Sequence, residues 1–101
     1  MNPIDQAISD KVIARKQELM KLSPAQLRQL PLYNAEQFSA CGKTQNLGVY
    51  HDKTGKGEDI VVTQCKRHIF LGYGHMFAEG FVLDSSDKIR DAEKELMWDY
   101  T

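Results

Sequence analysis

The sequence predicts an α+β fold in which an N-terminal helical hairpin and a C-terminal helix pack on a four-stranded antiparallel sheet, as a two-layer sandwich. Hydrophobic residues recur at helical spacing near both ends of the chain, whereas the period changes to two between about residues 33 and 85. Short turn segments separate the period-two runs, which favours a meander because parallel strands need long crossover connections. A chain of 101 residues forms one domain, residues 1–101, around one core.

The first predicted element is an amphipathic helix over residues 4–22. Asn2 can cap this helix, and Pro3 suits its first turn because the amide that proline lacks would have no helical partner there. Ser23-Pro24 ends the helix and begins a second short one, which Pro31 stops. The hydrophobic stripe of the first helix consists of Ile4, Ile8, Val12, Leu19 and Leu22, and Leu27 and Leu30 form the apolar edge of the second.

Four strands are predicted near residues 35–41, 46–53, 58–71 and 76–83. Residues 52–57 form a hairpin loop rich in residues that accept positive φ, and the Gly-Tyr-Gly run at 72–74 interrupts the period before the fourth strand. Asp84-Ser85-Ser86-Asp87 is predicted to cap a final helix that ends near Tyr100. Trp98 falls away from the stripe of that helix, so we expect it to be partly exposed or to lie in an interface. The stripe consists of Ile89, Ala92, Leu96 and Tyr100.

The third predicted strand is apolar at both ends on both of its faces. Three short helices cannot easily cover both faces of a sheet, so we expect another subunit or a partner protein to cover the second face. A β-bulge that exchanges the two faces midway along the strand explains the pattern equally well. If a homodimer forms, a charge at whichever of Val61 and Val62 faces outward is expected to separate its subunits.

The side chains best suited to chemistry lie between residues 65 and 79. Cys65-x-x-His68 resembles half of a metal site, but these two side chains would point to opposite faces of a strand. A structural zinc site also needs four ligands at close paired spacings, so the sequence predicts no metal site and no cofactor. The alternative is a site in which His51, His68 and His75 meet on adjacent strands. The candidate acid–base residues are His68, Tyr73, His75 and Glu79.

Cysteine and glycine motifs give no signature of catalysis. Cys65 suits either a buried core position or a reactive thiol whose pKa the nearby Arg67 would lower. The glycines match neither a dinucleotide fingerprint nor a phosphate-binding loop, and no nucleophile elbow is present. The N-terminus does not resemble a secretory signal, so we expect a cytoplasmic protein with reduced thiols at Cys41 and Cys65.

The charge of the chain excludes some classes of partner. Thirteen Lys and Arg against fourteen Asp and Glu give a net charge of −1, which indicates neither nucleic acid nor a membrane surface as a partner, and no apolar run approaches the ~20 residues of a membrane span. A basic edge from Lys53 to Arg67, with the aromatic residues Tyr50, Phe70 and Tyr73 near it, could still bind nucleic acid weakly. Four acidic residues in the same region oppose that hypothesis.

The sequence therefore predicts a small protein that binds another protein or itself. The two-sided strand, the aromatic residues near it and the lack of a catalytic signature support this function. The alternative is a small enzyme or ligand-binding domain that uses the segment from Gly72 to Glu79, and a deep apolar pocket with convergent polar groups would favour it. The residues predicted to contact a partner are Val62, Phe70, Tyr73, Phe77 and Phe81.

Overall fold

One long helix lies along one face of a five-stranded antiparallel sheet, which confirms the predicted α+β class. The computed structural model describes residues 2–70, 73–97 and 100. The elements, in chain order, are α1 (Pro3–Met20), α2 (Pro24–Arg28), β1 (Tyr33–Ala40), β2 (Lys43–Lys53), β3 (Asp59–Phe70), β4 (Tyr73–Leu83), β5 (Ile89–Asp91) and α3 (Lys94–Met97).

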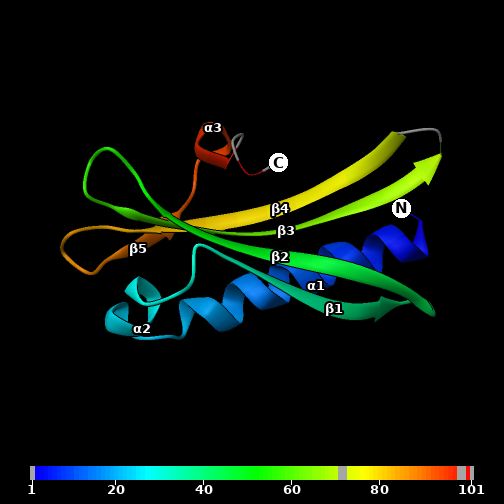
Figure 1. The fold of residues 1–101 in the computed structure, drawn as a ribbon, viewed down its shortest axis with the longest axis horizontal. Coiled ribbons are helices and arrows are strands. Elements are labelled where there is room, and N and C mark those ends of the chain that lie inside the picture. Colours follow the sequence, from blue (N-terminus) through cyan, green and yellow to red (C-terminus); the bar gives the residue numbers. More distant parts are fainter. Residues whose placement is uncertain (1, 71–72, 98–99, 101) are drawn as a thin grey trace.

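The strands follow one another across the sheet in the order β1-β2-β3-β4-β5, and each neighbouring pair is antiparallel. The predicted meander is confirmed, with one strand more than expected. Pairing of β2 with β3 runs only from Leu47–Cys65 to Lys53–Asp59. Beyond that point the two strands diverge, as the right side of Figure 1 shows. We call the space between residues 43–46 of β2 and 66–68 of β3 the fork.

The two N-terminal helices begin where the sequence predicts. The side chain of Asn2 accepts a hydrogen bond from the Ile4 amide at 2.8 Å, so it caps α1. A capping box joins Ser23 and Gln26 at the start of α2, with Pro24 in its first turn. Among the described residues, no helix is both long and apolar enough to cross a membrane.

The main core lies between α1 and the inner face of the sheet. Ile8, Val12 and Leu19 recur along one side of α1, and all three are buried. Burial of such side chains contributes about 1.5–3 kcal/mol each, so this stripe holds the helix to the sheet. The sheet residues of this core are Ala40, Leu47, Val49, Val61, Cys65, Phe81 and Leu83.

The C-terminal segment of the chain covers part of the outer face of the sheet. Met97 of α3 packs in a second cluster with Ile60, Val62 and Val82. Val61 and Val62 are both 0% exposed, because they point into the cores on opposite sides of the sheet. The expectation that one of them faces outward is therefore wrong, and a carboxylate at either position would destabilise the fold itself.

The face exchange that a mid-strand bulge would produce does not occur in β3. The register of β3 with β4 is continuous from Asp59 to His68, and the shift in register falls between His68 and Phe70. Side chains therefore alternate between the two faces of the strand up to His68. The apolar residues of one face are covered by α1 and those of the other by the C-terminal segment.

The predicted C-terminal helix over residues 84–100 is wrong in most of its length. Asp84 accepts hydrogen bonds from the amides of Ser86 and Lys88 within a tight turn, and Asp87 has a φ of 66°. The chain then forms β5 beside residues 81–83 of β4, and the α-helix that follows, α3, spans Lys94–Met97. An Asp that caps a helix and an Asp that closes a turn offer the same oxygen to nearby amides, so the sequence signal is shared. Trp98 lies outside the described residues.

Gly80 allows the C-terminal segment to pack closely on the sheet, and this contact can be tested. A Cβ at this position would lie 2.9 Å from Met97 Sδ and 3.0 Å from the Val61 carbonyl oxygen. We expect Gly80→Ala to reduce the free energy of unfolding by about 1–3 kcal/mol, measured by urea denaturation. Gly55→Ala is the matched control, because a Cβ there meets no atom within 4 Å. Equal stability of the two variants would contradict the described packing.

Candidate functional site

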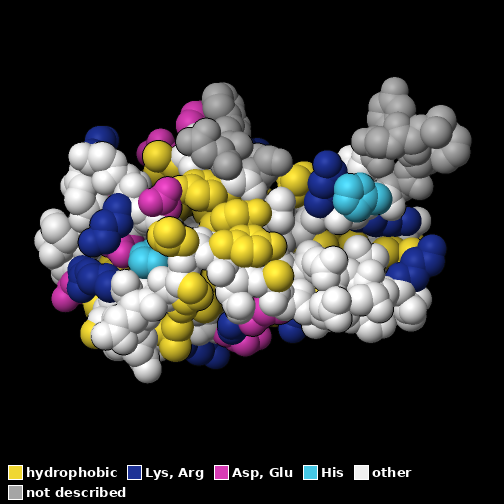
Figure 2. Space-filling view, viewed as in Figure 1, with side chains coloured by type: hydrophobic (Ala, Val, Ile, Leu, Met, Phe, Trp, Pro, Cys, Tyr) yellow, Lys and Arg dark blue, Asp and Glu magenta, His cyan; other side chains and the backbone are white. Residues whose placement is uncertain are grey.

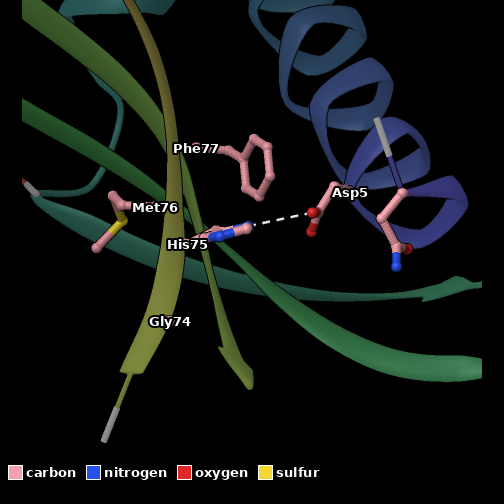
Figure 3. Close-up of a pocket in the computed structure, with 6 residues that line it drawn as sticks. Asp5, Gly74, His75, Met76 and Phe77 are labelled. Carbon is pink, nitrogen blue, oxygen red and sulfur yellow. Dashed lines mark hydrogen bonds and ion pairs between the residues drawn. The ribbon is translucent and has the colours of Figure 1, made fainter. Parts of the chain in front are cut away.

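The first candidate site lies where the N-terminal end of α1 meets β3 and β4. Asp5 is buried, and its carboxylate receives hydrogen bonds from Arg67 Nη1 at 2.5 Å and from His75 Nδ1 at 3.1 Å. Figure 3 shows the His75 and Phe77 side chains extending from β4 toward α1, whereas Met76 points to the other side of the strand. Residues of α1, β3 and β4 thus meet at one carboxylate.

An open hollow of about 640 Å³ adjoins this carboxylate. The side chain of His75 is 56% exposed, so its ring is accessible to solvent at the mouth of the hollow. His75 Nε2 has no hydrogen-bond partner within the described part of the chain. The residues that line the hollow are Asn2, Asp5, Gly74, His75, Met76 and Phe77.

The electrostatics of this cluster favour a charged Asp5. The hydrogen bond from Arg67 lowers the pKa of Asp5, burial opposes that shift, and the contact with His75 lowers the pKa further. A carboxylate that orients an imidazole through Nδ1 leaves Nε2 able to exchange a proton with a ligand. The hydrogen-bonded carboxylate and imidazole at the edge of this hollow are groups suited to acid–base chemistry or to binding.

The structure does not bring the four predicted acid–base residues together. His75 and Glu79 both belong to the inner side of β4, but His75 pairs with Asp5 and not with Glu79. His68 follows Arg67 on β3, so it points to the outer face of the sheet, away from His75. The side chain of Tyr73 lies outside the description. Within the described residues, no group of three His, Cys, Asp or Glu side chains could hold a metal ion.

A second histidine–carboxylate pair is enclosed in the protein and links two segments. His51 Nε2 lies 2.6 Å from Asp59 Oδ2, and His51 Nδ1 lies 2.8 Å from the Leu30 carbonyl oxygen. A carbonyl oxygen only accepts hydrogen bonds, so Nδ1 carries a proton. Both side chains are buried, and both ring nitrogens are engaged. This pair therefore fixes the segment after α2 to the sheet and is not accessible to a substrate.

Cys65 does not have the surroundings of a reactive thiol. It is fully buried in the main core, and burial raises the pKa of its thiol. Arg67, which would favour the thiolate in the reactive-thiol hypothesis, donates to Asp5. Cys41 is exposed in the turn between β1 and β2, where its φ is 51°. The structure thus supports the interpretation of Cys65 as a core residue.

The second candidate site is a surface on the outer face of the sheet. Tyr33 of β1 is 53% exposed, and its ring centroid lies 4.8 Å from that of Tyr50. Gly48 lies beneath these rings, since a Cβ there would approach them to 3.1–3.2 Å. Figure 2 shows hydrophobic side chains gathered near the middle of the molecule, with Lys or Arg and His side chains toward the end where β3 and β4 meet.

The residues predicted to contact a partner do not form one surface. Val62 and Phe81 are 0% exposed and belong to the two cores. Phe77 is partly buried and lines the hollow beside Asp5. The side chains of Phe70 and Tyr73 lie outside the description.

The basic edge proposed for nucleic acid is divided in the structure. In the β2–β3 register, Lys53 lies opposite Asp59 at one end of β3, whereas Lys66 belongs to the other end of the same strand. Seven residues of extended strand separate positions 59 and 66, about 23 Å. Arg67 turns to the inner face and forms an ion pair with Asp5, so Lys53, Lys66 and Arg67 do not form one continuous basic edge.

The Asp5 cluster predicts a specific dependence of stability on pH. Because the pKa of Asp5 is lower in the folded protein, its contribution is present above the unfolded pKa of about 3.9 and is lost as the pH falls through the folded value. We expect Asp5→Asn to be less stable than wild type near neutral pH and to lose less stability on acidification, measured as urea midpoints between about pH 7 and pH 2. Asp91→Asn removes a carboxylate that is 79% exposed and should follow the wild-type pH profile. Parallel profiles for wild type and Asp5→Asn would contradict the coupling.

Sequence patterns did not identify Asp5 and Tyr33 as site residues. Asp5 lies 62 residues from Arg67 and 70 residues from His75, so no local spacing connects the three. Tyr33 lies just before the predicted first strand, and its contact with Tyr50 depends on the register of β1 with β2. No family model, no curated protein and no solved structure matches this chain.

Proposed function

We propose that the protein functions by binding protein chains, and first of all by self-association through the outer edge of β1. The observation that carries this proposal is that β1 is an edge strand whose first residue, Tyr33, and the residue before it, Leu32, are the most exposed large hydrophobic residues of the described part of the chain. A second copy of the chain is the proposed occupant of this edge.

The edge of β1 has few of the features that prevent strand pairing. It is eight residues long and pairs with β2 without a bulge. It contains no proline and no lysine, and its single charged residue, Glu36, binds Arg15 at 2.9 and 3.0 Å. Natural edge strands are usually shortened, bulged or charged, because an unprotected edge pairs with other chains.

Exposed hydrophobic residues lie at the start of the same strand and immediately before it. Leu32 is 74% exposed and Tyr33 is 53% exposed. Tyrosine is enriched at protein interfaces because it buries a large area at a small cost in conformational entropy. Antiparallel pairing of β1 with β1 of a second copy has two-fold symmetry, so each subunit contributes the same surface. The open strand edge and the exposed hydrophobic residues then lie within one isologous interface.

This proposal differs from the dimer that the sequence pattern suggested. That dimer required the second face of β3 to be uncovered near Val62. The C-terminal segment covers this position within the monomer, so the outer edge of β1 replaces the sheet face as the proposed contact. The protein-binding function is retained, but its location changes.

A charge near the centre of β1 tests the proposed interface. We expect Gln37→Lys to raise the dimer dissociation constant by about tenfold or more, because the two-fold axis brings the two lysines together. Sedimentation equilibrium of wild type and variant measures this constant, and circular dichroism checks the fold. Gln17→Lys is the matched control, since Gln17 is an exposed residue of α1.

Two outcomes would contradict the proposal. A wild-type protein that remains at 11.5 kDa up to millimolar concentration would exclude self-association. An equal loss of assembly in Gln17→Lys would show that net charge, and not the edge of β1, controls association.

A further inference from the structure

The fork contains polar side chains that the fold itself does not use. A hollow of about 360 Å³ lies there, between β1–β2 on one side and β3 on the other. Six of its lining residues have polar side chains with no hydrogen bond or ion pair to the described part of the protein. They are Thr44, Gln45, Asn46, Gln64, Lys66 and His68, and Tyr33 and Gly48 complete the lining.

Strand edges on both sides of the fork are also unpaired. Residues 43–46 of β2 pair with β1 on their other side, and residues 66–68 of β3 pair with β4. Neither segment pairs with the other, since the ladder between these strands ends at Leu47–Cys65. Backbone N–H and C=O groups that point into the fork therefore have no strand partner there, and such groups bind an extended chain by strand addition.

The charge of the fork is positive. Lys66 and His68 are exposed, and the described lining contains no Asp or Glu. Arg67, between them, turns to the other face and is neutralised by Asp5. A segment with acidic side chains at alternate positions would place its charges beside Lys66 and His68, because side chains on one face of a strand recur every second residue.

We propose that the fork binds an extended acidic segment of a partner protein, which adds a strand to the unpaired edge of β3 from Lys66 to Phe70. This edge spans about 16 Å, enough for five residues of the partner. The amide side chains of Gln45 and Asn46 contact the segment from the β2 side. Tyr33 borders both this surface and the outer edge of β1, but Lys66 belongs to β3 and Gln37 to β1, so the variants at these two positions separate docking from self-association.

The fork favours a peptide over a nucleic acid. A single-stranded nucleic acid needs a basic groove and several exposed aromatic rings on which its bases stack. The described lining offers one tyrosine and one lysine, and the chain carries a net charge of −1. Unpaired backbone groups at strand spacing, in contrast, complement a polypeptide.

The experiment uses a nine-residue peptide of alternating Thr and Glu, labelled with fluorescein, and measures its binding by fluorescence anisotropy. We expect binding that weakens with salt and a dissociation constant that rises by about tenfold or more in Lys66→Glu. Lys53→Glu is the matched control, because Lys53 is an exposed lysine at the opposite end of the β2–β3 ladder. In ¹⁵N spectra, the largest shifts should fall on residues 44–46 and 64–68, with slower amide exchange at the β3 edge.

Each of several results would overturn the proposal. These are no binding at millimolar peptide, equal binding of an alternating Thr and Lys peptide, and equal weakening in Lys53→Glu. Tighter binding of a nine-residue oligothymidylate than of the Thr and Glu peptide would assign the fork to nucleic acid instead. Because Lys66 is exposed, circular dichroism should show that Lys66→Glu is folded, and His68→Glu provides a second variant that adds a negative charge to the fork.

Discussion

The burial of one side of α1 against the inner face of the sheet is the contact on which the rest of this structure depends. Ile8, Val12 and Leu19 are buried in the same core cluster as Val61 and Phe81 of the central strands. Isolated antiparallel strands and single helices are marginal in water, so neither layer is expected to be stable alone. With one face occupied by α1, the chain must cover the other face by different means.

In the part of the chain that the structure describes, the second face is covered at one end, and this asymmetry determines which surfaces are open. Ile60, Val62 and Val82 are covered by C-terminal residues, and the Tyr100 hydroxyl donates to Asp52 at 2.9 Å. The C-terminal residues of this cluster are Ala92, Leu96, Met97 and Tyr100. At the other end, β2 and β3 separate, and polar side chains line the fork. A sheet that is closed at one end and divided at the other offers backbone groups for pairing without exposing its core.

Much of the fold could be predicted from local sequence, because the signals concerned are local. The stripe of α1, its Asn2 cap and the alternation in β3 depend on residues that are adjacent or one turn apart. The helix predicted for the C-terminal region was wrong because Asp84 can close a turn as well as cap a helix. Pairing of the following residues with β4 selected the turn.

The candidate sites were less accessible to prediction. His75 was identified from its type, but its partner Asp5 is 70 residues away and depends on how α1 lies across the strands. The fork depends on where the pairing of β2 and β3 stops, which no residue in either strand marks clearly. Contacts between elements, and not the elements themselves, are what single-sequence patterns left undetermined.

The central claim is that the sheet is closed in its middle and open at the fork and at the outer edge of β1. Native-state amide hydrogen exchange tests this claim residue by residue. The account predicts the slowest exchange for residues 61–65 of β3, which lie between two paired strands under both covers. Amides of residues 43–46 and 66–68 that point into the fork, and outward amides of β1, should exchange close to the unprotected rate in dilute protein. Protection at those edge amides equal to that of residues 61–65 would contradict the account.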